Sequence, residues 1–307
     1  MTMFAIFWSL FVLSLLGLYQ TVSRRSLCAG LTIRYSWAWS VVAMLVCCVS
    51  ILASYTTTGH AADWFPPRWQ LGLQYLSAIL LLTPAVCTLG ARRPGVSAWQ
   101  WFVVLPLVFV LAWPVLVQLT TSHGRGTIQL SGPAITGFAL VTLMSISPGL
   151  GGAMTVPALL YLSAVLLTIW PLTGWPFFSV PAGQVAVIPL VISGQLTNRQ
   201  LKNRYQQISL ATSEIHRLNA VWGLLQDLYG VVWPQRMMDR MKQFQQAERW
   251  CGCLTAEGFR KTDGTAWTPQ ELESPVKSFR WVLQRFADSD WIDQYVPLIR
   301  EESQLPG

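Results

Sequence analysis

The sequence predicts an all-α polytopic membrane protein, with about seven transmembrane helices followed by a mainly α-helical cytoplasmic domain that contains a short β-hairpin. Three observations support this fold class. Hydrophobic residue types make up 52% of the 307 residues, and the mean hydropathy is +0.42. Charged types make up only 11%, whereas soluble globular proteins carry roughly 25%. These values exclude a soluble enzyme, a disordered chain and a small secreted disulfide scaffold.

The apolar residues are concentrated in seven stretches, each close to the roughly 20 residues that a helix needs to cross the hydrocarbon of a bilayer. The stretches are residues 3–21, 37–55, 70–90, 101–119, 131–147, 153–171 and 180–196. They must be helical, because lipid offers no partners to open peptide groups. The region 131–196 allows a second interpretation, in which Ser147–Gly152 is a re-entrant loop. We favour a tight turn there, since loops of this length are ordinary.

The charges divide the chain into two parts. Before Asn198 there are seven arginines and one acidic residue, Asp63, whereas the remainder carries 14 Lys/Arg and 13 Asp/Glu. This shift predicts a transmembrane domain over 1–196 and a cytoplasmic domain over 197–307. The basic residues follow the first, third and seventh spans, so the positive-inside rule places the N-terminus outside and the C-terminal domain in the cytoplasm. These loop residues are Arg24, Arg25, Arg34, Arg92, Arg93, Arg199, Lys202 and Arg204.

Polar groups within the spans bear on the type of activity. No ionisable side chain is expected inside the seven spans, which argues against a proton-coupled or ion-driven pump. Gln74, Gln118 and Gln184 could line a polar cavity between the helices. Several prolines also fall within the spans, where they could expose carbonyl groups to a solute. We expect instead that the membrane helices simply tolerate them.

The C-terminal part opens with the most regular pattern in the sequence. Apolar residues recur at alternating spacings of three and four, which places them on one face of a helix that continues from the seventh span and ends at Gly230. One interpretation is a two-stranded coiled coil, and thus a homodimer through helix 205–230. We favour packing inside the domain itself, because aromatic residues suit a globular core better. The residues are Ile208, Ala211, Ile215, Leu218, Trp222, Leu225 and Tyr229.

The remainder of the C-terminal part predicts shorter elements. A second helix begins at Pro234, because proline suits the first helical turn. The pair Asp263-Gly264 is a hairpin-turn signal, so two short strands are expected around it. The pair Ser274-Pro275 predicts the cap and first turn of a third helix.

Several groups of residues have side chains that can bind metal ions. They are the external-loop residues His60, Asp63 and His123, the pair Cys251 and Cys253, and the cluster Asp288, Asp290 and Asp293. None has the spacing typical of a zinc site or a calcium loop. We therefore interpret the first set as exposed loop residues and the cysteines as strand or loop residues. Asp290 is interpreted as the cap of a helix that begins at Trp291, with Asp293 in its first turn. No metal or cofactor is predicted.

Four segments carry a resemblance to known proteins. They are Gly90–Gly95 (GARRPG), Pro157–Tyr161 (PALLY), Trp222–Arg240 (WGLLQDLYGVVWPQRMMDR) and Phe279–Asp293 (FRWVLQRFADSDWID). These segments resemble a group of uncharacterised multi-pass membrane proteins from planctomycete bacteria. The resemblance touches both halves of the chain and implies a bacterial inner membrane. It implies no catalytic activity, cofactor or site residue.

The sequence contains no phosphate-binding glycine loop, nucleophile elbow, zinc-protease motif or kinase signature. We therefore expect a non-enzymatic membrane anchor or scaffold, held in the lipid bilayer, whose C-terminal domain docks a protein partner. No nucleic acid partner is expected, because the basic residues are spread over short loops. The candidate docking residues are of types favoured in interfaces, although core packing is the preferred interpretation for most of them. They are Trp222, Tyr229, Trp233, Met237, Met238 and Trp250.

Two other functions stay open at this point. One is a carrier or channel for a neutral or apolar solute, which would need a polar cavity between helices at mid-membrane depth. The other is a sensor that transmits a signal from the outer loops through the helix at 197–230. No output module is recognisable for such a sensor.

Overall fold

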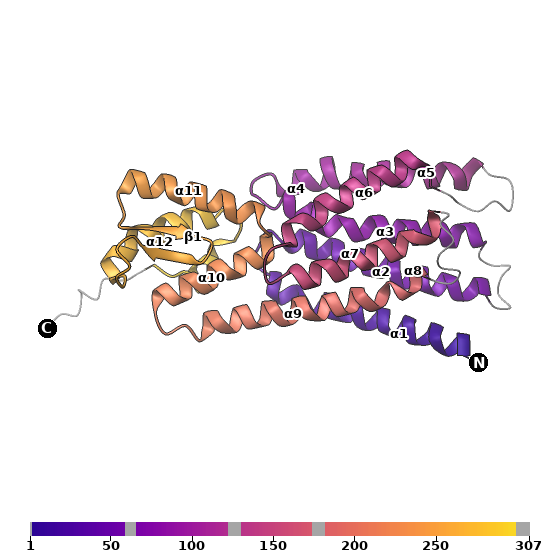
Figure 1. Ribbon diagram of the computed structural model, residues 1–307, viewed down its shortest axis with the longest axis horizontal. Coiled ribbons are helices and arrows are strands. Elements are labelled where there is room, and N and C mark those ends of the chain that lie inside the picture. The colour runs from indigo at the N-terminus through magenta and orange to yellow at the C-terminus, as the bar shows by residue number, and fades with distance from the viewer. Residues whose placement is uncertain (1, 59–65, 122–129, 174–181, 299–307) are drawn as a thin grey trace.

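The structure is a computed structural model, which describes residues 2–58, 66–121, 130–173 and 182–298. It is an elongated bundle of long helices with a smaller, mostly helical domain at one end (Figure 1). Within the described residues, six helical stretches are long and apolar enough to cross a membrane. A mainly helical fold with several helices able to span a membrane is therefore confirmed. The six stretches are Phe4–Cys28, Arg34–Tyr55, Arg68–Leu89, Val96–Thr121, Gly132–Gly149 and Thr155–Leu172.

The bundle is built from long helices whose apolar side chains face either one another or the outside. Its core is a cluster of buried aliphatic and aromatic residues centred on α2 and α3. Many other large apolar side chains are exposed, as lipid contact requires. The bundle elements are α1 (Thr2–Ser23), η1 (Arg24–Cys28), α2 (Arg34–Thr58), α3 (Pro67–Leu89), α4 (Val96–Trp99), the π-helical η2 (Gln100–Val104), α5 (Leu105–Thr121), α6 (Gly132–Ile146), η3 (Ser147–Gly149), α7 (Thr155–Ile169) and η4 (Trp170–Leu172).

The predicted seventh span corresponds, where it is described, to α8 (Ala182–Val185) and the first part of α9 (Val187–Ser209). Helix α9 runs beside α1 and α7 (Figure 1). It is not among the six apolar stretches, because its second half is polar and carries basic residues such as Lys202. A seventh crossing therefore stays a prediction.

The stretch Ser147–Gly152, which allowed two interpretations, forms the short η3 and a turn between α6 and α7. The turn meets the C-terminal domain, because the Val231 N–H donates to the Pro148 carbonyl at 3.1 Å. The favoured prediction of a tight turn agrees with this geometry.

The C-terminal domain packs helices around a small two-stranded sheet. The strands are antiparallel, with Gly252 opposite Lys261 and Thr255 opposite Gly258. The buried faces of the helices and one face of the hairpin meet in a single hydrophobic cluster. The elements are α10 (Glu214–Tyr229), α11 (Val232–Glu248), β1 (Gly252–Thr255), β2 (Gly258–Lys261), α12 (Pro269–Leu283) and α13 (Ser289–Tyr295).

The prediction of one continuous helix from the seventh span to Gly230 is wrong. Helix α9 ends at Ser209, and α10 begins at Glu214. The Ser213 side chain caps α10 by accepting from the His216 N–H at 3.3 Å, and such caps favour a helix start over continuation. The break lets α10 fold back along α9 (Figure 1). Gly230 does end α10, with a positive φ of 67°.

The predicted hairpin turn is also displaced. The two strands are joined at Ala256 and Glu257, whereas Asp263 and Gly264 follow the second strand. The Asp263 carboxylate accepts from the Thr265 N–H at 3.0 Å, which stabilises a local turn outside the hairpin.

Two predicted helix starts need correction. Helix α12 begins at Pro269, behind a capping box formed by Thr268 and Glu271, and Pro275 lies inside the helix. The capping box satisfies two free N–H groups, so it overrides the weaker signal at Ser274-Pro275. Helix α13 begins at Ser289, with Asp288 rather than Asp290 at the N-cap position.

The C-terminal domain shares its core with the ends of the membrane helices. Leu31 and Ala91, from the turns after η1 and α3, belong to the same buried cluster as α10, α11 and α12. Leu31 also forms an antiparallel β-bridge with Ala287. The Thr32 N–H donates to the Phe286 carbonyl at 2.9 Å. These contacts make the domain and the bundle one packed unit.

Candidate functional site

A polar cavity of about 130 Å³ lies between α1, α2, α3, α7 and α9. It is in the half of the bundle nearest the C-terminal domain, because it is lined by the end of α1 and the beginning of α2. Apolar residues form part of its wall, but seven polar side chains also line it. These are Gln20, Thr21, Arg24, Ser40, Tyr161, Ser193 and Thr197.

The end of α1 and the adjoining η1 supply the most polar wall of the cavity. Gln20 and Arg24 are four residues apart, a spacing that places both side chains on one helix face. The Arg24 Nη2 donates to the backbone carbonyl of Gly194 in α9. A Cβ at Gly194 would lie 2.8 Å from that nitrogen, so the arginine would have to shift if this residue had a side chain. The contact therefore ties the end of α1 to α9 across the cavity.

Two buried polar atoms at this site have no partner among the residues that the structure describes. They are the Nε of Arg24, which is a donor, and the Oε1 of Gln20, which is an acceptor. A buried donor or acceptor without a partner costs about 1–3 kcal/mol, so such atoms are normally satisfied by water or a ligand. The cavity can thus accept a molecule that offers both an acceptor and a donor.

The side chains of Tyr161 and Ser193 form a partition, a wall that the cavity shares with a second hollow. The Tyr161 hydroxyl donates to the Leu81 carbonyl, and the Ser193 hydroxyl donates to the Pro157 carbonyl at 2.8 Å. A second, more open hollow of about 200 Å³ lies beyond this partition, bordered by α6, η3 and α7. Tyr161 and Ser193 line both spaces, and the buried Ser145 hydroxyl in the second has no described partner. Polar groups therefore continue from the cavity toward the surface.

The residues that sequence reasoning proposed for a polar cavity do not line this one. Gln74 instead donates to the Thr168 carbonyl at 3.0 Å, and neither Gln118 nor Gln184 borders the cavity. Arg24 lies just outside the predicted first span, 3–21, in the loop assigned from the sequence, but the first apolar stretch of the structure extends over it, from Phe4 to Cys28. Its position four residues after Gln20 was the available signal.

The six candidate docking residues lie mostly inside the C-terminal domain. Met238 is half-buried, and the other five are buried. The exposed fractions are 1% for Trp222, 6% for Trp233 and 9% for Trp250. Their surroundings match the core-packing interpretation, and they do not present a surface to a partner.

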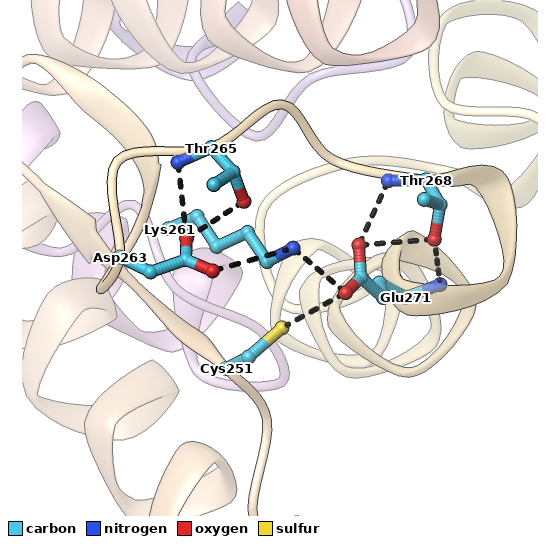
Figure 2. Close-up of polar contacts among 6 residues, drawn as sticks. All are labelled: Cys251, Lys261, Asp263, Thr265, Thr268 and Glu271. Atoms are coloured by element: carbon cyan, nitrogen blue, oxygen red, sulfur yellow. Dashed lines mark hydrogen bonds and ion pairs between the residues drawn. The ribbon is translucent and has the colours of Figure 1, made fainter.

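A polar cluster at one end of the domain contains the exposed Cys251 (Figure 2). Lys261 Nζ lies 2.8 Å from a Glu271 carboxylate oxygen and 3.8 Å from one of Asp263. Lys261 and Thr268 hold the pKa of Glu271 well below its usual range, at about 2. The cluster therefore works as a charged helix cap that joins β2 to α12.

The candidate metal ligands are dispersed where they are described. The part of the chain with described coordinates holds no group of three His, Cys, Asp or Glu residues that could bind a metal ion. Asp288 pairs with Arg93, and Asp293 pairs with Arg280. The loop candidates His60, Asp63 and His123 lie outside the described residues.

The fold and the cavity define the class of protein as a mainly helical one, with six helices long and apolar enough to span a membrane and a polar cavity among its helices. No family model matches the chain, and no curated protein or solved structure is significantly similar to it. The resemblance to the planctomycete group therefore stays a prediction.

Proposed function

We propose that this protein is a carrier for a small polar solute, which binds in the cavity around Arg24. The observation that carries the proposal is the unpartnered pair formed by the Arg24 Nε and the Gln20 Oε1, both buried in a space bordered by α1, α2, α3, α7 and α9. Polar cavities between helices are the usual location of solute sites in transporters. The docking hypothesis has weaker support, because most of its anchor residues are buried.

The chemistry of the cavity selects the solute. A guanidinium group stays protonated in proteins and offers only donors, so the solute must carry an acceptor such as a carboxylate, a carbonyl or a hydroxyl. The Gln20 Oε1 favours a donor on the same molecule. The proposal thus replaces the expected neutral or apolar solute with a small, acceptor-bearing one.

The same proposal includes seven crossings, with the N-terminus outside and the C-terminal domain in the cytoplasm of a bacterial inner membrane. Helix α9 would be the seventh crossing, and its alignment with α1 supports this (Figure 1). Arg92 and Arg93 lie at the same end of the bundle as the domain, since the Arg93 N–H donates to the Arg285 carbonyl at 2.9 Å. Arginine-rich loops favour the cytoplasmic side.

The test uses purified full-length protein in proteoliposomes and in detergent. A panel of small radiolabelled carboxylates, amides and polyols is screened first for thermal stabilisation of the protein, and then for uptake. We expect at least one solute to stabilise and enter, and the variant Arg24→Gln to abolish both effects. The matched control is Arg25→Gln, because Arg25 is the next residue, carries the same charge and is exposed.

Two results would overturn the proposal. One is that no member of the panel stabilises or enters. The other is that Arg24→Gln transports as well as Arg25→Gln. A second variant, Gln20→Leu, guards against misfolding of the arginine variant, because it removes the unpartnered acceptor and leaves the contact between Arg24 and Gly194 in place.

A further inference from the structure

A basic groove lies where the turn between α3 and α4 meets α11 and α12. It consists of two adjoining hollows of about 620 and 360 Å³, which share Arg92, Trp281 and Arg285. Arg93 borders one hollow, and Arg236 borders the other. The groove is separate from the cavity around Arg24, with which it shares no lining residue.

Aromatic rings support the guanidinium groups in this groove. The Arg285 guanidinium lies 4.7 Å from the centroid of the Trp281 ring, and that of Arg240 lies 5.2 Å from the same ring. Arg236 is similarly placed 5.1 Å from the Trp233 ring. Stacking of this kind orders the guanidinium plane but uses none of its N–H donors.

The donors of several groove arginines are unoccupied. Among the residues that the structure describes, the guanidinium groups of Arg92, Arg236 and Arg285 have no hydrogen bond or ion pair with a protein acceptor. Arg240 donates to the Gln243 side chain at 2.5 Å. Of the five arginines, Arg93 alone pairs with a carboxylate within the described chain, that of Asp288. The groove therefore has a strong excess of positive charge.

The position of the groove identifies the source of its ligand. Arg92 and Arg93 lie between the apolar stretches that end at Leu89 and begin at Val96, which is the depth of the lipid headgroups. The positive-inside rule accounts for arginines in this turn. It does not require three more arginines, two from α11 and one from the turn after α12, to converge on the same place. Basic pockets beside transmembrane helices are typical binding sites for anionic lipid headgroups.

We propose that this groove binds a phosphate ester anion, supplied by the anionic phospholipids of the surrounding leaflet. Planar guanidinium groups match phosphate oxygens in pairs of hydrogen bonds. Bound there, a headgroup would contact the bundle through Arg92 and the C-terminal domain through Arg236 and Arg285. It would thereby strengthen the junction between the two parts.

The experiment uses delipidated full-length protein in a mild neutral detergent. Binding of dihexanoyl phosphatidylglycerol is compared with binding of dihexanoyl phosphatidylcholine and of inorganic phosphate, by calorimetry and by the shift in melting temperature. The double variant Arg236→Gln/Arg285→Gln should bind phosphatidylglycerol about 20- to 30-fold more weakly, since each surface arginine contributes roughly a factor of five. Arg92→Gln provides an independent variant in the turn, and the melting temperature without lipid reports folding.

Lys242→Gln is the matched control, because Lys242 lies on α11 and is exposed but borders neither hollow. Tighter binding of phosphatidylglycerol than of phosphatidylcholine, lost in the double variant, supports the proposal. Inorganic phosphate that competes with equal affinity supports the phosphate site but assigns it a soluble ligand. Equal binding of the two lipids with no binding of phosphate overturns the proposal, as does equal loss in the Lys242 control.

Discussion

Gly230 connects the C-terminal domain to the membrane helices, and its replacement by alanine tests that connection. Its φ and ψ are 67° and −159°, a combination that essentially only glycine adopts and that costs another residue about 1–3 kcal/mol. A Cβ on this residue would lie 2.6 Å from the Pro148 Cβ and 2.7 Å from the Pro148 carbonyl oxygen. Alanine would therefore meet both backbone strain and a steric clash.

The clash acts on a hydrogen bond as well. The Val231 N–H donates to the same Pro148 carbonyl at 3.1 Å, and its loss costs about 1 kcal/mol. Backbone strain and the lost bond together predict that Gly230→Ala destabilises the protein by about 2–4 kcal/mol. At roughly 2–4 °C per kcal/mol for a large chain, that corresponds to a decrease in melting temperature of roughly 4–16 °C.

Gly151→Ala provides the matched control. Gly151 lies in the same turn as Pro148 and has a φ of 89°, but a Cβ there meets no described atom within 4 Å. It should therefore show only backbone strain of about 1–2 kcal/mol. The assay is tryptophan fluorescence during thermal unfolding of both variants in mild detergent. Equal melting temperatures for the two variants would refute the assigned contact between the domain and the turn.

Two further predictions concern the C-terminal domain. Because the folded-state pKa of Glu271 is held at about 2, below its usual value, its carboxylate contributes stability at neutral pH that is lost as the pH falls from about 4.5 toward 2. The gap in melting temperature between Glu271→Gln and the native chain should thus shrink over this range, and a gap independent of pH would contradict the assignment. Cys251 is exposed, whereas Cys28, Cys47, Cys48 and Cys87 are buried. A bulky membrane-impermeant maleimide should therefore label Cys251 in inverted vesicles but not in intact cells, with Cys251→Ser as the blank, and labelling of intact cells would reverse the proposed orientation.

The sequence predicted a structural element correctly where the physical cause of that element lies within one short segment of the chain. Hydropathy located the six apolar stretches, because each depends on about 20 consecutive residues. Gly230 marked the end of α10, because a positive φ favours glycine whatever lies around it. Pro234 indicated the approximate start of α11, because proline suits the first turn of a helix.

Other predictions failed because contacts with distant residues, or a second local motif that overlaps the first, determine the structure instead. Asp263-Gly264 has the composition of a hairpin turn, but Lys261 next to it pairs with Glu271 and Asp263 binds Thr265. These contacts fix the segment outside the hairpin. From the sequence, Arg24 is interpreted as an ordinary loop arginine, because its partner Gly194 lies 170 residues away. Nothing near Arg24 in the sequence indicates that α9 will supply a carbonyl group there.

The shared core also limits how the functions can be separated. Removal of the chain after Asn198 would expose Leu31 and Ala91, which are now 0% and 1% exposed. It would also leave the Thr88 carbonyl without the Trp233 indole N–H, which donates to it at 2.8 Å. If the truncated protein loses activity, the cause could therefore be either a damaged bundle or a missing binding surface. Point variants at Arg24 and at Arg236 distinguish the cavity from the groove, because each changes one site and leaves Leu31, Ala91 and the bond from Trp233 to Thr88 in place.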